Sequence, residues 1–339
     1  MLMSCTHTAL ESRLQMLPGV MPLTHPSATE IFNNLKAAHW NPEKNSLNHS
    51  LAYFTFTGRK GAWLYYSEDT IVIFCWHPNI KNQLLVYPPI GRDFTAIYRL
   101  LDLLAPLFSD VRLARFSQEE ATYFIANNQS ESIFFMKVIE ENILDWKFAS
   151  PVLSTQKATE KTGPDLHLVR KEYRKLDLIQ LETRPYVRIY YDRLAEVGHV
   201  YADLFLSQNK DFALGADQIT QPNADMLNLV LERPDLYQSY VTLYKGRVEG
   251  FYVLEKFAPH YANALWFLYN RSIRGLAYWQ MTQLCEMLKK ENIHTVNLGG
   301  SETNGMDFFK TRFRPIQSFS ACSIDVELMA QKAFIPKAA

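Results

Sequence analysis

Two successive segments of the chain carry the same order of predicted elements, and this order constrains the fold more than any other feature of the sequence. In each segment apolar runs of strand length come first, and a helix, a strand, a second helix and a last strand follow. Glycine, proline and acidic pairs separate the early runs, which is typical of an antiparallel meander. A strand that follows a helix favours parallel pairing with an earlier strand. The chain is therefore expected to form two α/β domains with mixed central sheets.

The predicted elements divide at a polar stretch over residues 150–165, which gives expected domains of 1–150 and 151–339. In the first domain the patterns predict strands at 51–58, 62–68, 70–76, 82–89, 111–116 and 132–139, with helices at 27–40 (capped by Ser27), 94–108 and 117–128 (capped by Ser117). In the second they predict a hairpin at 238–258 around Lys245-Gly246, strands at 176–183, 262–270, 294–300 and 320–326, and helices at 166–176, 188–208, 222–232 (with Pro222 at its start), 275–292 and 306–313.

Size and charge restrict the class of protein. A chain of 339 residues with 47% hydrophobic residues suits two ordinary domains. Lys plus Arg equal Asp plus Glu at 35 each, so any polyanion site must be a local patch. The four cysteines form no close pair, which suits a reducing compartment, and neither a signal peptide nor a membrane helix is apparent. A soluble, cytoplasmic protein is expected.

The stretch NLGGSETNGMDFFKTRFRP, residues 297–315, is the strongest candidate for a substrate site. Gly299-Gly300 lets the backbone turn or approach a ligand closely, and Asn304 is expected to cap the next helix. Met306, Phe309 and Phe313 share one helix face, whereas Lys310 and Arg314 share another. Two cations beside a helix start suit a phosphate. The alternative is a strand-to-helix turn with a solvated basic face.

This stretch resembles the end of the catalytic domain of Fem-type and phosphatidylglycerol-lysyltransferase-type (DUF2156) aminoacyltransferases. The family pattern Gly-x-x-x-x-Gly-x-x-x-Phe-Lys-x-x-Phe is matched by Gly300, Gly305, Phe309, Lys310 and Phe313. The segments WHP, YPPIG and LLDLLAPLF are similar to the first half of that domain. The resemblance implies two tandem GNAT-like (acyl-CoA N-acyltransferase-like) domains. It also implies transfer of an amino acid from aminoacyl-tRNA to an amine or hydroxyl of a small molecule, peptide or lipid headgroup, without a cofactor.

A basic segment could contact the acceptor end of such a tRNA. Arg170 and Lys171 resemble the basic start of a helix in the lysyltransferases, although Glu172 replaces the usual Asn. Arg170 and Arg174 share one helix face. The alternative is an ordinary solvated helix. The six cations of this segment are Lys157, Lys161, Arg170, Lys171, Arg174 and Lys175.

An acyl-CoA enzyme of the same fold is the rival. Such enzymes hold a pyrophosphate with [Gln/Arg]-x-x-Gly-x-[Gly/Ala] at a helix start, and RSIRGLA matches it at Gly275 and Ala277. Ser272 stands at the Gln/Arg position, and Arg274 could compensate. Acetyl-CoA or another acyl-CoA would then be the donor. A third possibility is a non-catalytic GNAT-derived binding protein.

Transfer requires a general base. Glu302 in the glycine loop is the first candidate, followed by Asp307 and Glu255; Glu249 and His260 are weaker. Scattered histidines and cysteines give no metal-ligand spacing, so no metal is expected. Cys75 and Cys285 lie in apolar segments typical of a core.

Overall fold

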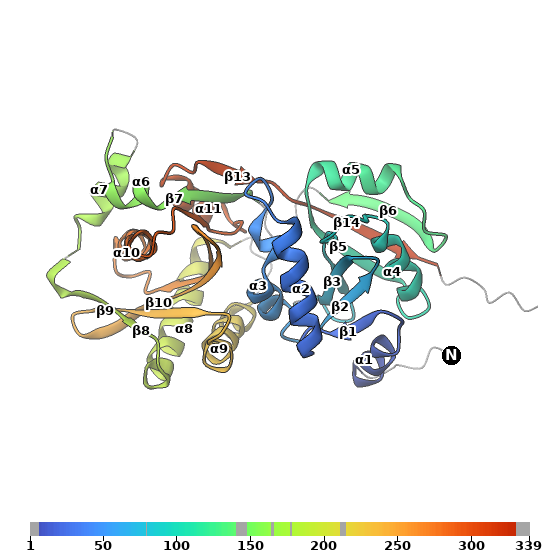
Figure 1. The fold of residues 1–339 in the computed structure, drawn as a ribbon. Helices are drawn as coiled ribbons and strands as arrows, with labels where there is room; N and C mark the ends of the chain where they lie inside the picture. The colour runs from blue at the N-terminus through green and yellow to red at the C-terminus, as the bar shows by residue number, and fades with distance from the viewer. Residues whose placement is uncertain are drawn as a thin grey trace, which may run out of the picture. The chain divides into compact units, whose positions relative to one another are not determined.

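The computed structural model describes residues 7–78, 80–139, 148–163, 166–176, 178–210 and 215–329. The chain divides into two compact units, one from Met1–Asn142 and Ser320–Ala339 and the other from Ile143–Phe319 (Figure 1). The described strands form two mixed sheets of seven strands, in the orders β1-β2-β3-β4-β5-β14-β6 and β13-β7-β12-β11-β10-β9-β8.

The first unit is a twisted sheet with helices on both faces. Helices α4 and α5 pack on the main core of this sheet, whereas Phe32 of α2 and Phe54 of α3 meet on the opposite side with ring centroids 6.0 Å apart. Its elements are α1 (His7–Gln15), β1 (Val20–Pro22), α2 (Pro26–His39), η1 (Ser46–His49), α3 (Leu51–Thr57), β2 (Ala62–Ser67), β3 (Thr70–Trp76), β4 (Leu84–Val86), α4 (Ala96–Leu104), β5 (Asp110–Phe116), α5 (Gln118–Ala126), β6 (Ile133–Ile139) and β14 (Cys322–Leu328).

The second unit repeats this plan. Helices α6, α7 and α10 share one core with the sheet. Helix α8 packs against α9 and against strands β10 and β11. Its elements are β7 (Ser150–Ser154), α6 (Thr155–Glu160), α7 (His167–Tyr173), η3 (Leu178–Gln180), β8 (Leu181–Pro185), η4 (Arg188–Tyr190), α8 (Tyr191–Gln208), α9 (Ala216–Glu232), β9 (Gln238–Tyr244), β10 (Arg247–Ala258), β11 (Tyr261–Tyr269), α10 (Leu276–Lys290), β12 (Thr295–Asn297), α11 (Asn304–Thr311) and β13 (Gln317–Phe319).

The two sheets have the same topology, except that one corresponding strand comes from a different place in the chain. In each sheet a single parallel pair, β4–β5 or β11–β12, lies among antiparallel neighbours. The strand beyond that pair is β14 in the first sheet and β7 in the second. Thus the last described strand, β14, completes the first unit, whereas β7, which precedes the helices of the second unit, completes the second. The expected domains 1–150 and 151–339 do not include this return of the chain.

Several local predictions agree with the structure. Ser117 caps α5 in a full capping box with Glu120, since each side chain bonds the other's backbone N–H. Lys245 and Gly246, both with positive φ, form the turn between β9 and β10. These features depend on neighbouring residues alone.

Other local predictions are wrong. Residues 51–57 of the run predicted as a strand form helix α3, because Ser50 accepts a hydrogen bond from the Tyr53 N–H and Leu51, Phe54 and Thr57 are buried at helical spacing. Helix α2 begins at Pro26, so its cap is His25 and not Ser27. Pro222 lies inside α9 instead of at its start.

Candidate functional site

The second sheet forks where its parallel strands separate. β11 pairs with β12 only through Tyr261–Asn263 and Thr295–Asn297. Beyond Asn263, β11 pairs with β10 alone among the described strands, and a register shift follows Val253. After Asn297 the chain leaves the sheet through Gly299 and Gly300. The candidate site is built at this fork.

A row of buried polar side chains crosses the sheet at the fork. Glu255, Asn263 and Asn297 occupy neighbouring register positions on three strands, and Ser150 lies on the next strand. Asn263 Nδ2 donates to Glu255 Oε2 at 2.7 Å, and Ser150 Oγ donates to Asn297 Oδ1 at 2.5 Å. Glu255 is 7% exposed, and the other three are fully buried. Buried polar groups require such mutual bonding, so the row fixes the geometry of the fork.

The sequence predicted only Glu255 of this row. Asn263 and Asn297 belong to apolar strand segments and Ser150 begins the polar stretch taken as a domain boundary, so their type did not mark them as site residues. An asparagine within each of the runs YANAL and TVNL was the available signal, because a buried amide in a strand needs a partner.

The glycine loop is tied to this row. Asn297 Oδ1 accepts a hydrogen bond from the Gly299 N–H at 3.0 Å, and Gly299 has a φ of 67°, which favours glycine. Thr303, and not Asn304, caps α11 by accepting from the Met306 N–H. Asn304 is instead the first helical residue. Gly305 has open space around the position of a Cβ, so packing does not require glycine there.

Lys310 turns back onto the loop that precedes its helix. Its Nζ donates to the carbonyl oxygens of Gly299 at 2.9 Å and Gly300 at 2.5 Å. Burial lowers the pKa of Lys310 to about 8, although the carboxylates of Glu302 and Asp307 act in the opposite direction. The sequence-based interpretation expected the partners of Lys310 to lie on a ligand. Instead, backbone carbonyls hold this cation in the protein.

Arg314 does not share a helix face with Lys310. Helix α11 ends at Thr311, and Arg314 follows in left-handed backbone with a φ of 54°. The predicted pair of parallel cations is therefore not formed. The expected apolar face of Met306, Phe309 and Phe313 is formed in part: Phe309 of α11 and Phe313 beyond its end pack edge to face with ring centroids 5.7 Å apart, and both belong to the core shared with α10.

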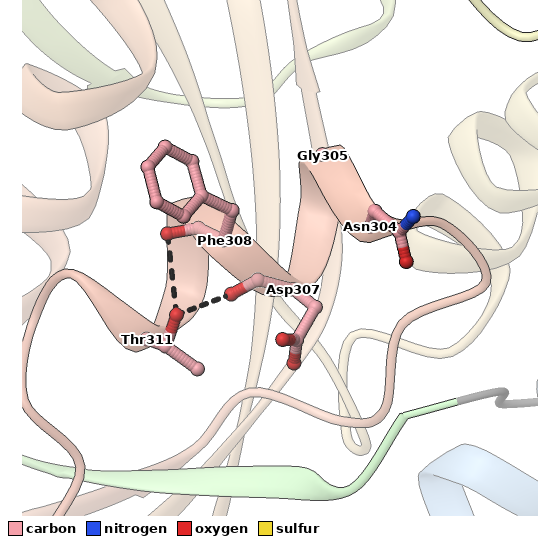
Figure 2. A pocket seen from close by; sticks show the side chains of 5 residues that line it. All are labelled: Asn304, Gly305, Asp307, Phe308 and Thr311. Carbon is pink, nitrogen blue, oxygen red and sulfur yellow. Dashed lines mark hydrogen bonds between the residues drawn. The ribbon is translucent and has the colours of Figure 1, made fainter.

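The opposite face of α11 borders an open hollow of about 440 Å³ (Figure 2). Phe308 is 57% exposed there, and the guanidinium of Arg312 lies 4.0 Å from its ring centroid. Arg312 Nη1 in turn donates to the hydroxyl of Tyr278 on α10 at 2.5 Å. The hollow is lined by Asn304, Gly305, Asp307, Phe308 and Thr311.

Some cations of the basic helix α7 are exposed to solvent, whereas Arg170 bonds groups of the protein. Arg170 Nη1 donates to the carbonyl oxygens of Lys161 and Gly163, at 2.5 and 2.7 Å, and so fixes the end of α6. Lys171 and Arg174 are exposed. An open hollow of about 540 Å³ runs along this face, lined by His167, Arg170, Lys171, Arg174 and Lys175.

Helix α7 also closes the start of α10. Gly275, which precedes α10, has a φ of 91°, and a Cβ there would lie 2.5 Å from the carbonyl oxygen of Glu172. Arg274 is largely exposed, with its Nε 3.8 Å from the Glu172 carboxylate. Ser272 donates to the side chain of Asn270. Thus the residues that resemble a pyrophosphate loop face a carbonyl and a carboxylate.

The remaining carboxylate and histidine candidates have clear positions. Glu249 is buried and bonded to Arg193 Nη2 at 2.7 Å and to Asn270 Nδ2 at 2.8 Å, which is a structural ion pair. His260 Nδ1 lies 2.7 Å from the Asn292 carbonyl and its ring stacks on His294, away from the glycine loop. Glu302 remains in the loop, near Lys310.

No protein-family model matches the sequence, and no curated protein matches it. Solved structures do. L-PGS from Bacillus licheniformis is 13% identical with a TM-score of 0.56, covering 91% of this chain and 93% of its own. FemX is 11% identical with a TM-score of 0.58 (92% and 98% covered). A tandem GNAT protein from the clavulanic acid biosynthesis pathway is 11% identical with a TM-score of 0.53 (91% and 98%).

At these identities the similarity shows the fold. The chain consists of two tandem GNAT-like domains with mixed central sheets, as the resemblance to the aminoacyltransferases implied. Within the described part of the chain, no helix combines the length and apolarity that crossing a membrane requires.

Proposed function

We propose that the chain is an aminoacyltransferase that moves an amino acid from aminoacyl-tRNA to an amine or hydroxyl of a small molecule, a peptide or a lipid headgroup. The fold is shared with FemX and L-PGS, and the glycine loop and α11 carry the residue pattern of that family. Low identity means that the choice of donor rests on the site.

The choice of aminoacyl-tRNA over an acyl-CoA as donor rests on one observation, which is that α7 covers the start of α10. A GNAT enzyme that uses coenzyme A places a pyrophosphate there, where free N–H groups and the helix dipole favour anions. In this chain the Glu172 carbonyl occupies the space beside Gly275, and the Glu172 carboxylate adds negative charge. An anion would have to displace α7. The basic face of α7, with Lys171 and Arg174, offers RNA phosphates a place outside the sheet.

The proposed chemistry is attack of an amine or hydroxyl on the aminoacyl ester. The nucleophile loses a proton, a new bond forms to the carbonyl carbon, and the ester C–O bond to the tRNA breaks as the terminal hydroxyl leaves with a proton. Glu302 is the proposed general base, with Asp307 and Glu255 as the other candidates. Lys310 fixes the carbonyls of Gly299 and Gly300, and its charge favours the developing oxyanion near the fork.

The acyl-CoA alternative has one supporting observation. Arg274 is 79% exposed beside Gly275 at the start of α10, where a pyrophosphate would need a cation. If α7 moved away, this arginine could bind acetyl-CoA or another acyl-CoA. No cofactor is required by the preferred reaction.

The test is to incubate the protein with a mixture of charged tRNAs and a metabolite, peptide and lipid extract, and to identify products by mass spectrometry. RNase-sensitive transfer of an amino acid supports the proposal. Tight binding of coenzyme A by calorimetry, with acetyl-CoA turnover and no transfer from tRNA, overturns it.

Lys310→Ala tests the role of the glycine loop. The variant should lose most transfer activity, because the loop carbonyls lose both hydrogen bonds and the site loses its charge. Lys289→Ala, which removes a lysine near the end of α10, is the matched control and should remain active. Full activity of a folded Lys310→Ala variant would show that the assigned role is wrong.

A further inference from the structure

An exposed aromatic ring is held rigid on the outer face of α11. Phe308 is 57% exposed, yet one face of its ring is covered by the Arg312 guanidinium at 4.0 Å. Arg312 is itself fixed by its hydrogen bond to Tyr278. A cation–π contact of this kind is worth about 0.5–1 kcal/mol at an exposed site. The free surface of Phe308 is therefore ready for a planar partner without further loss of side-chain freedom.

Polar side chains line the same hollow as this ring. Figure 2 shows that Asn304 and Asp307 extend from the same helix as Phe308. An amide and a carboxylate supply both donors and acceptors for the edge of a nucleobase. Thr311 also lines the hollow, and its hydroxyl donates to the carbonyl oxygens of Asp307 and Phe308 in its own helix.

Helix α11 and the basic helix α7 border the same end of α10. Both α11 and α7 meet the first turn of α10: Arg312 bonds Tyr278, and the Glu172 carbonyl packs on Gly275. Lys171 flanks Glu172 directly in the sequence, and Arg174 lies two residues beyond it. An aromatic platform beside exposed cations is the usual combination for single-stranded nucleic acid, whose bases stack while its phosphates meet the cations.

We propose that Phe308 is a stacking platform for an unpaired base at the end of the donor RNA. This rests on the proposed function. The base stacks on the free face of Phe308, Asn304 and Asp307 bond its edge, and the neighbouring phosphates lie toward Lys171 and Arg174. Stacking accepts any base, and the Asp307 carboxylate favours one with an exocyclic amino group.

The probe is a short single-stranded RNA with 2-aminopurine as its last base, whose fluorescence is quenched by stacking. We expect quenching on binding, and Phe308→Ala should weaken affinity by about 5- to 150-fold, the range for loss of one base–aromatic stack. Phe308→Tyr should bind like the parent because it keeps the ring. Phe135→Ala, which removes a phenylalanine of β6 that is 52% exposed, is the matched control and should have no effect.

The outcomes separate this inference from the proposed function. Quenching that depends on Phe308, without any transfer activity, supports the platform and rejects only the reaction. Transfer from tRNA with RNA affinity unchanged in Phe308→Ala overturns the platform and leaves the reaction standing. If Phe308→Ala instead weakens binding of coenzyme A and not of RNA, the base in question is the adenine of that donor and the inference is wrong.

Discussion

Adding a single methyl group at Gly275 should push α7 away from the start of α10. The Gly275→Ala substitution places a Cβ 2.5 Å from the Glu172 carbonyl oxygen and 3.3 Å from Leu176 Cγ. The nearer contact is with backbone, so a side-chain rotation cannot relieve it. No capping side chain is lost, because glycine supplies none. The helix α7 must move, or the start of α10 must distort.

The magnitude has two parts. An alanine held in left-handed backbone costs about 1–2 kcal/mol, partly offset by about 0.4–1 kcal/mol from the reduced freedom of the unfolded chain. The steric contact adds about 1–3 kcal/mol, the usual cost of overpacking. Gly163→Ala isolates the first part, because Gly163 has a similar φ of 85° and no atom within 4 Å of its Cβ position, whereas Gly275 has a φ of 91°.

Hydrogen exchange measured by mass spectrometry on peptides from α7 and α10 is the assay. Gly275→Ala should speed exchange in both helices by about 5- to 150-fold more than Gly163→Ala does, since about 1.4 kcal/mol corresponds to tenfold. Equal exchange in the two variants would refute the close approach of α7 to Gly275. It would also remove the argument against a pyrophosphate at that position.

Two further predictions concern buried charge. Arg193→Met should lower the free energy of unfolding in urea by about 3 kcal/mol, because Glu249 stays buried without its main partner. Adding Glu249→Gln should restore part of the loss. An unchanged free energy of unfolding in Arg193→Met would show that Glu249 does not depend on this partner. Burial lowers the pKa of His49 from 6.5 to about 4, so the unfolded chain binds a proton that the folded chain excludes. The free energy of unfolding should therefore fall by about 3 kcal/mol as the pH drops from about 6.5 to about 4. His49→Asn should not show this part of the loss. Identical pH profiles of the two proteins would contradict the lowered pKa of His49.

The sequence by itself determined the features that depend on neighbouring residues. The repeated order of strands and helices gave two α/β halves, because element type follows from periodicity. The Ser117 cap, the Lys245-Gly246 turn and the packing of Phe309 and Phe313 also formed as expected. For the cap and the turn, the decisive contacts span only a few residues.

Tertiary structure decided whatever depends on distant partners. Strand β14 joins the first sheet from the far end of the chain, which no local pattern shows. The run at 51–58 has strand-forming residues, yet its residues 51–57 form a helix that buries Leu51 and Phe54 in the first unit.

The same reason explains the site. Lys310 bonds two carbonyls ten and eleven residues away, so its spacing in the helix could not reveal its partners. Asn263 and Asn297 come from strands that pair only in the folded sheet. Gly275 matters because Glu172, from a different helix, packs against it. Long-range packing thus settled which groups of the candidate site are bonded within the protein.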